Sequence, residues 1–261
     1  MKAIVLFAAA AACLGVASAT ATAQDFQKSY RLAPGARIAV SSMSGNVTVT
    51  GYDGDEVVVV GTKTGADRDR VEIEDRSTAG EVEIGVRYPN RGRNDASVDF
   101  DVRVPSGIAF RFDKINSMSG NVEIRNVSGQ IEATSMSGNV TVENVSGTVE
   151  ATAMSGNVDV DIDRLDGSGN LSFTSMSGNV EVRLPSDIDA HVEMKTASGR
   201  VSTDFPIEVR EQKYGPGMSA SGRLGSGSRT PRVRSMSGAA RLLRRWLRRQ
   251  TKTGPGGQGP T

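Results

Sequence analysis

The side chains that could carry acid–base or nucleophilic chemistry in this sequence are few. It has one histidine, His191, and one cysteine, Cys13. His191 stands in Asp187–Glu193, where apolar and polar residues alternate, as in a strand with one buried face. We therefore expect His191 to be a solvent-facing strand residue and not a general base.

A run of carboxylates is the second candidate for chemistry. Asp159, Asp161 and Asp163 alternate with Val160 and Ile162. Glycoside hydrolysis uses a pair of carboxylates, so a polysaccharide-acting enzyme on a β-helix is one interpretation. Alternation alone, however, places all three carboxylates on the polar face of one strand. We expect no catalytic residue here and a protein that is not an enzyme.

The same stretch, Asp159–Asn170, could be interpreted as a calcium loop, because calcium prefers oxygen ligands at alternate positions with a glycine at the sharp turn. Arg164 and Leu165 stand where that glycine would be, and the long acidic ligand is missing. We expect neither a metal site nor a cofactor.

The C-terminal segment Ala240–Arg249 is the most distinctive stretch. If it is a helix, which we favour, its leucines and Trp246 lie on one side and its arginines on the other, as in a helix that binds an anionic membrane surface. Alternatively, it is the last strand, or it folds back onto the acidic body. The candidate membrane- or anion-binding residues are Arg241, Leu242, Leu243, Arg244, Arg245, Trp246, Leu247, Arg248 and Arg249.

The charge of the chain is divided along its length. Eleven basic and no acidic side chains follow Glu211, so the body before it is net acidic. Such a division is typical of an interaction tail. The expected partners are an anionic membrane surface, an envelope protein or a polysaccharide. Nucleic acid is not expected, because the protein is predicted to be exported.

Export is predicted from Met1–Ala23, which has a charged start at Lys2, an apolar stretch and a small-residue cleavage site at Ala21–Ala23. Cys13 lies inside this signal peptide, so the mature chain would need no disulfide. The short, alanine-rich signal looks bacterial, which predicts a periplasmic or extracellular protein. No later segment is long and apolar enough to span a membrane.

The elements that would position these residues follow from an internal repeat. Within Ser117–Val158 a Ser-Gly step recurs every nine residues, and pairs of nines form an 18-residue unit. A fixed period of this kind indicates a stacked array. Each half of the unit has a turn and a short alternating strand, so one unit closes a flattened coil. The fold class is all-β: a parallel β-solenoid with flanking antiparallel strands near the N-terminus.

The repeat also predicts which side chains point inward. Val122, Val140, Val158 and Val180 should form one interior column. Strict alternation would point the residues before the Ser-Gly steps outward. We expect the turn to shift the inward–outward alternation by one residue, so that these residues form a second buried ladder. A metal-binding or redox-sensing methionine cluster is the alternative. This second row contains Met118, Val127, Met136, Val145, Met154 and Met176.

The predicted domains are a signal peptide at 1–23, a β-solenoid at 24–243 and a basic, partly disordered tail at 244–261. Within the solenoid, we expect interrupting strands at 56–104 that cap or flank the first coil, because an open solenoid end exposes a strand edge. Regular repeats should follow at 114–201, and a Gly/Ser-rich loop at 214–228.

Taken in order, these features resemble the bacterial DUF4097 family of adhesin-type β-strand repeat proteins. The resemblance implies a parallel β-solenoid in the cell envelope with an adhesin-like or envelope-stress role. The chain departs from the family at Ala239-Ala240, which replace a polar residue and valine. The segments that carry the resemblance are the Met-Ser-Gly-Asn-Val repeats, Val102–Gly107, Arg183-Leu184-Pro185, Thr196–Val201 and Arg232–Gly238.

We therefore expect an exported, non-enzymatic β-solenoid that acts as a binding or scaffold module in the cell envelope. A periplasmic envelope-stress partner of a membrane protein is the main alternative. A polysaccharide-acting enzyme on a β-helix is the weaker alternative. The sequence does not indicate the oligomeric state.

Overall fold

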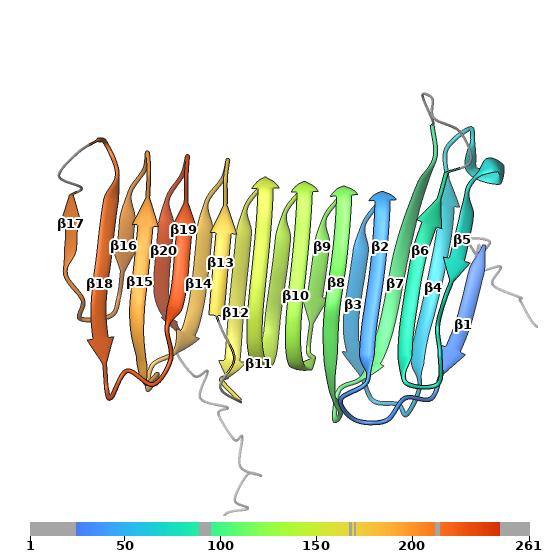
Figure 1. The fold of residues 1–261 in the computed structure, drawn as a ribbon, viewed down its shortest axis with the longest axis horizontal. Coiled ribbons are helices and arrows are strands. Elements are labelled where there is room, and N and C mark those ends of the chain that lie inside the picture. The colour runs from blue at the N-terminus through green and yellow to red at the C-terminus, as the bar shows by residue number, and fades with distance from the viewer. Residues whose placement is uncertain (1–24, 89–94, 167–168, 170, 212–214, 246–261) are drawn as a thin grey trace, which may run out of the picture.

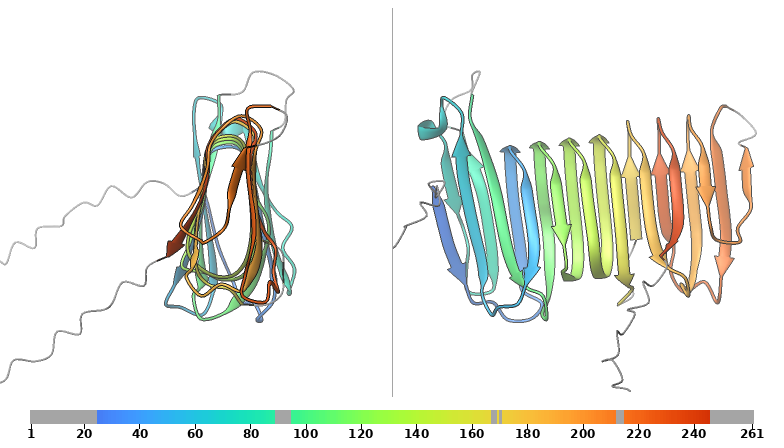
Figure 2. Two further views of the ribbon diagram at one scale, coloured as in Figure 1. Left: turned by 90° about the vertical axis from the view of Figure 1, so that its left-hand side faces the viewer. Right: turned by 180° about the vertical axis from the view of Figure 1, so that it is seen from behind.

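The computed structural model describes residues 25–88, 95–166, 169, 171–211 and 215–245. The predicted signal peptide lies outside these residues. The described chain is a flattened coil whose strands lie side by side along one long axis (Figure 1), and its end-on view shows two facing layers (Figure 2). The predicted all-β solenoid is confirmed; the helical content of the described residues is the short 3-10 turn Arg68–Arg70.

The two layers are defined by strand pairing. The first sheet contains, in spatial order, β5 (Glu72–Asp75), β6 (Glu81–Arg87), β2 (Arg37–Ser44), β8 (Ala109–Ser119), β10 (Ser128–Ser137), the second half of β11 (Val140–Ser155), β13 (Leu171–Ser175), β19 (Pro231–Ser235), β15 (Ala190–Thr196), β18 (Met218–Leu224) and β17 (Val209–Glu211). The second sheet contains β1 (Phe26–Tyr30), β4 (Val57–Thr64), β7 (Ser97–Pro105), β3 (Val47–Tyr52), β9 (Val122–Arg125), the first half of β11, β12 (Val158–Arg164), β14 (Val180–Pro185), β20 (Ala240–Arg245) and β16 (Val201–Thr203).

The coils do not stack in the order of the chain. The coil of β2 and β3 lies between the pair β6–β7 and the pair β8–β9. The last coil, β19 and β20, lies between β13–β14 and β15–β16 (Figure 1). The first and last repeats of the chain are therefore held on both sides by other coils.

Antiparallel strands flank the stack at both ends. β1 pairs with β4, β4 with β7, and β5 with β6, which confirms that the interrupting strands flank the first coil. At the other end, β18 pairs antiparallel with β15 and β17. Residues 218–224 were predicted as part of a loop, which is wrong. A Cβ on Gly222 would lie 2.4 Å from Ile207 Cγ2, so one glycine of this segment serves close packing within a strand.

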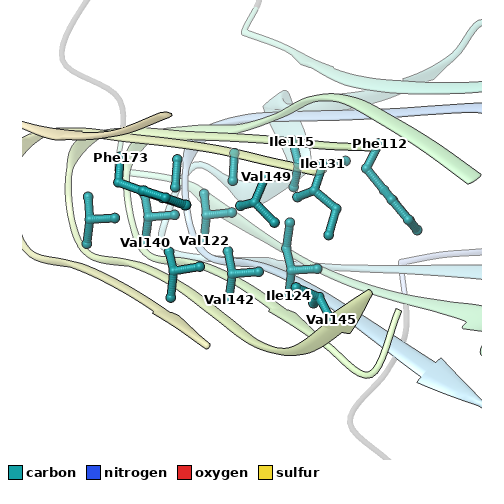
Figure 3. Packing of buried hydrophobic residues seen from close by; sticks show 14 of the residues in the cluster. Phe112, Ile115, Val122, Ile124, Ile131, Val140, Val142, Val145, Val149 and Phe173 are labelled. Carbon is teal, nitrogen blue, oxygen red and sulfur yellow. The ribbon is translucent and has the colours of Figure 1, made fainter. Parts of the chain in front are cut away.

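The predicted interior column is confirmed. Val140 pairs with Val122 on one side and Val158 on the other, and Val158 pairs with Val180. All four are buried. Figure 3 shows Val140 and Val122 facing Val149 and Phe173 of the first sheet. The alternation of apolar and polar residues thus fills a thin core between the two sheets.

The methionines of the predicted second ladder are exposed, so that prediction is wrong for them. Met118 is 46% and Met136 is 42% exposed, whereas Val127 and Val145 are buried. The methionines follow inward-facing serines, and strict alternation continues outward from there. Asn126 and Asn144, which precede the two valines, have φ of 57° and 53° and shift the alternation at that turn.

The Ser-Met-Ser-Gly-Asn turn owes its glycine to a close approach between coils. A Cβ on Gly138 would lie 2.2 Å from the carbonyl oxygen of Gly120 in the next coil. Gly138 does not have a positive φ. The other turn of the repeat does: Gly147 has a φ of +126°. A Cβ on Gly147 would also lie 2.0 Å from the Gly129 carbonyl oxygen, so close approach requires glycine at both turns and the positive φ is an added reason at Gly147.

Side chains connect each turn to its neighbour. Ser135 Oγ donates to the Gly120 carbonyl at 2.8 Å, and the Asn139 backbone N–H donates to Asn121 Oδ1 at 2.9 Å. The same serine bond recurs at Ser117, Ser175 and Ser235, and the same asparagine bond joins Asn46, Asn121, Asn139, Asn157, Asn179 and the N–H of Ala239. Because alanine has no side-chain amide oxygen to accept the next bond, the chain of asparagine bonds ends at Ala239.

We predict that Val140→Asp lowers the free energy of unfolding by about 3–5 kcal/mol, because it places an unpaired carboxylate in the core. Urea denaturation measures the change. The control is Thr152→Asp, which lies outward between Thr134 and Thr174 and should have little effect. Equal stabilities for Val140→Asp and wild type would show that Val140 does not face the core.

Candidate functional site

A groove of about 400 Å³ lies at the far end of β14 from the Ser-Met-Ser-Gly-Asn turns. Four segments form it: the end of β12, the turn between β14 and β15, the residues before β19, and the end of β20. Its lining residues are Asp163, Arg164, Leu165, Pro185, Ser186, Asp187, Ile188, Asp189, Ser228, Arg229 and Arg245.

The acidic run lies beside this groove. Asp159, Asp161 and Asp163 point outward from β12, as the alternation predicted. Arg183 Nη1 contacts Asp159 Oδ1 at 2.9 Å. Arg245 reaches over β14, with Nε at 3.1 Å from Asp161 Oδ1 and Nη1 at 2.9 Å from Asp163 Oδ1. The structure therefore brings the three carboxylates together and pairs each of them with an arginine.

Asp161 is the carboxyl group of this run that is most removed from water. Burial raises its pKa above the ordinary value, and the positive charges of Arg245 and Arg183 oppose that rise. Its Oδ1 is buried and has no well-aligned hydrogen bond in the described structure. The charge of Asp161 therefore depends on the nearby guanidinium groups, and on Arg245 most of all.

One wall of the groove is held by Asp189. Its Oδ2 accepts from the Ser226 hydroxyl at 2.6 Å and its Oδ1 from the Gly227 N–H at 2.7 Å. These bonds, led by the Ser226 hydroxyl, lower the pKa of Asp189 to about 2. Asp189 is thus ionised at neutral pH and fixes the loop that precedes β19.

Two charged side chains of the groove are exposed. Arg164 ends β12, and Asp187 lies in the turn between β14 and β15. Neither forms a salt bridge with any residue that the structure describes. Their charges are therefore available to a ligand. The apolar side chains of Leu165, Pro185 and Ile188 line the same groove.

The sequence did not indicate that this groove exists. Ser228 and Arg229 were assigned to a linker or to the basic tail, and Asp187 and Asp189 to a strand. The residues come from segments between 163 and 245, and stacking alone brings them together. One feature of the sequence could have indicated the groove. After the strand residues Val180–Leu184, Pro185-Ser186-Asp187 replaces the residues with which a regular repeat would continue.

His191 lies on β15, half-buried on the outward side, which confirms a strand histidine. Ser221 Oγ lies 3.4 Å from its Nε2, and Arg223 is its partner across the antiparallel pair. Its ring lies on the outer surface of the first sheet and is not a lining residue of the groove.

The favoured helix over Ala240–Arg249 is wrong for its described part, because 240–245 form strand β20. β20 pairs with β14 and β16, and Leu242 is fully buried, so the apolar face of a helix cannot form. The alternative of a last strand is confirmed for 240–245, and Arg245 of this strand contacts Asp161 and Asp163 of the acidic body. Trp246, Leu247, Arg248 and Arg249 lie outside the described residues. Nowhere in 25–245, as far as it is described, is there a helix long and apolar enough to cross a membrane.

The other described arginines of this segment are also engaged. Arg241 Nη1 lies 3.7 Å from Glu181 Oε2. The Arg244 guanidinium lies 5.3 Å from the centre of the Phe205 ring. The described part of the predicted anion-binding segment is therefore largely occupied by contacts within the protein.

The interpretation of Asp159–Asn170 as a calcium loop finds no ligand cluster. In the part of the chain that the structure describes, no group of three or more His, Cys, Asp or Glu side chains is placed to hold a metal ion. Asp159 and Asp161 face arginines instead. Asn170 lies outside the described residues.

Comparisons with known proteins give a family and two solved structures to which the chain is similar. The sequence model of the family described as Toastrack DUF4097 matches residues 28–242. A "putative cell adhesion protein" from Clostridium sporogenes is 13% identical, with a TM-score of 0.43, over 84% of this chain and 99% of its own. A "putative adhesin" from Bacteroides fragilis is 12% identical, with a TM-score of 0.30, over 84% and 96%. No curated protein matches the sequence.

We predict that Arg245→Gln lowers the free energy of unfolding at pH 7 by about 1–3 kcal/mol, because it leaves the Asp161 carboxylate without its main partner. The loss should shrink as the pH falls from 7 toward about 4, because a carboxyl group with a raised pKa then takes up a proton and no longer needs the arginine. Denaturation at several pH values measures this.

Adding Asp161→Asn to Arg245→Gln should restore most of the lost stability. The control is Arg210→Gln, since its partner Glu208 is exposed and the pair should contribute little. A loss that is independent of pH, or that Asp161→Asn does not reduce, would contradict the assigned role of Arg245.

Proposed function

This chain belongs to the Toastrack DUF4097 family, and on that premise we propose that it is an exported, non-enzymatic binding module of the cell envelope. We further propose that the groove between β12, β14 and β20 binds a polyhydroxylated ligand, a short stretch of an envelope polysaccharide. The observation that carries this proposal is the exposed pair of charges, Arg164 and Asp187, in a groove that the apolar side chains of Leu165, Pro185 and Ile188 also line.

The chemistry of the lining fits a saccharide. A sugar ring has an apolar face and a rim of hydroxyl groups. The apolar side chains of Leu165, Pro185 and Ile188 can contact the ring face. Asp187 can accept hydrogen bonds from the sugar hydroxyls, and Arg164 can donate hydrogen bonds to them. A volume of about 400 Å³ is within the range of sites that bind small ligands.

The groove is also held rigidly before any ligand binds. Asp189 fixes the loop that carries Ser228, and Arg245 fixes the end of β20 through Asp161 and Asp163. A preformed site loses less conformational entropy when it binds. This favours a binding role on a scaffold that does not need to move.

The ion pairs of the acidic run favour binding over hydrolysis. Carboxylates that cleave a glycosidic bond must exchange a proton with, or attack, the sugar. Asp161 and Asp163 share the Arg245 guanidinium, and Asp159 pairs with Arg183. Export is supported by the predicted signal peptide at Met1–Ala23, which would place the solenoid where such polysaccharides occur.

We predict that Asp187→Asn and Arg164→Gln each weaken saccharide binding by about tenfold or more, the effect of losing a charge-assisted hydrogen bond. Calorimetric titration with a panel of neutral and acidic envelope oligosaccharides measures this. The control is Glu132→Gln, an exposed carboxylate of β10 that does not line the groove. If no oligosaccharide binds, or both variants bind as tightly as wild type, the groove is not the ligand site.

The enzymatic alternative has its own test. Wild-type protein incubated with uronic and neutral polysaccharides should release no product. Cleavage by wild type that is abolished by Asp161→Asn or Asp163→Asn would reverse the proposal, since both residues would then act on the substrate.

A further inference from the structure

Six methionine side chains form one straight row along the edge made by the Ser-Met-Ser-Gly-Asn turns. They are between 41% and 53% exposed, and they are the exposed large hydrophobic side chains of the described chain. In spatial order they are Met43, Met118, Met136, Met154, Met176 and Met236.

The register of the strands places these methionines directly beside one another. Met136 lies opposite Met154, because the serines before and after it pair with Ala153 and Ser155. The Met236 N–H donates to the Ser175 carbonyl and the Ser177 N–H to the Met154 carbonyl, so the row continues through Met176 to Met236. Neighbouring strands lie about 4.8 Å apart, which sets the spacing of the side chains in the row.

The row rests on a rigid base. The inward serines before four of the methionines, Ser117, Ser135, Ser175 and Ser235, each bond to a glycine carbonyl of the next coil. The asparagine that follows each turn bonds to the next turn along the edge. The turn residues around the methionines are serine, glycine, asparagine and alanine, which carry no charge. The thioethers are therefore presented at fixed intervals along uncharged turns, with Arg234 as an exposed charge two residues before Met236.

We infer that this methionine row is a binding site for a soft monovalent metal cation, Cu(I) or Ag(I). Thioether sulfur is a soft, neutral ligand of the kind that selects Cu(I) over harder divalent ions. Metal–sulfur bonds are about 2.3 Å long, so two bonds in line span about 4.6 Å. That span is close to the strand spacing, so one cation can bridge two consecutive methionines.

The length of the row sets the expected capacity. Six thioethers taken in consecutive pairs hold about three ions. Beyond Met236 the next coil has Ala197 at the equivalent position, since Thr196 pairs with Ser235. The row of sulfur ligands therefore ends there.

The test is an anaerobic titration of the full chain with Cu(I), in competition with a chromophoric Cu(I) chelator. We expect wild type to withdraw about three ions from the chelator and Zn(II) not to bind to the row. The affinity should not change between about pH 5 and 8, because a thioether has no proton to lose, unlike histidine or cysteine.

Three double variants locate the ions: Met43→Leu with Met118→Leu, Met136→Leu with Met154→Leu, and Met176→Leu with Met236→Leu. Leucine keeps the size and apolar character of methionine on this exposed edge, so each variant should fold. Each should lose one of the three ions, and the sixfold variant should lose all of them. The control is Met194→Leu, since Met194 is buried and lies outside the row.

Three results would overturn the inference: wild type failing to withdraw Cu(I) from the chelator, leucine variants that keep full capacity, or an affinity that falls as histidine or carboxylates take up protons. The last would place the ion elsewhere. None of these results bears on the groove, which lies at the other end of β14 from the methionine row.

Discussion

The stacking of one Ser-Met-Ser-Gly-Asn turn directly on the next is the constraint on which the rest of this protein depends. At Gly138 there is no room for a Cβ, because the Gly120 carbonyl would lie 2.2 Å away. The Asn139 N–H and the Ser135 hydroxyl bond to the adjacent turn, and the second bond satisfies a hydroxyl that would otherwise be buried without a partner. These contacts hold the coils in register, so a residue in one coil lies beside its equivalent in the next.

Because the register is fixed, the residues at one position of the repeat lie beside one another in successive coils and form a row along the molecule. The inward row is the column through Val140, and the two outward rows considered above are the methionine row and the charged face of β12 and β14. The outward positions differ in chemistry from one row to the next, as the exposed methionines and the charged residues of β12 show. The thioether row and the groove lie at opposite ends of β14.

The first and last repeats of the described chain are secured by insertion into the stack. β20 lies between β14 and β16, and its Arg245 pairs with Asp161 and Asp163 two strands away. A terminal strand with paired neighbours on both sides leaves no edge of its own to other chains. The antiparallel strands β1, β4, β17 and β18 then flank the two ends of the stack. The inserted β20 also supplies Arg245 to the groove, so the groove is complete only when β20 is in place.

The sequence by itself determined the solenoid, the inward column through Val140 and the outward face of Asp159, because a nine-residue period and strict alternation are local properties. Alternation also pointed Met136 outward, and the error there came from assuming that the turn reset it. Only the tertiary structure decided that β19 and β20 insert between earlier coils, that 240–245 form a strand, and that Arg164, Asp187 and Arg245 meet at one groove. The physical reason is that every coil offers nearly the same strand edges to every other. Which coils become neighbours is therefore settled by packing between distant segments and not by the pattern within any one of them.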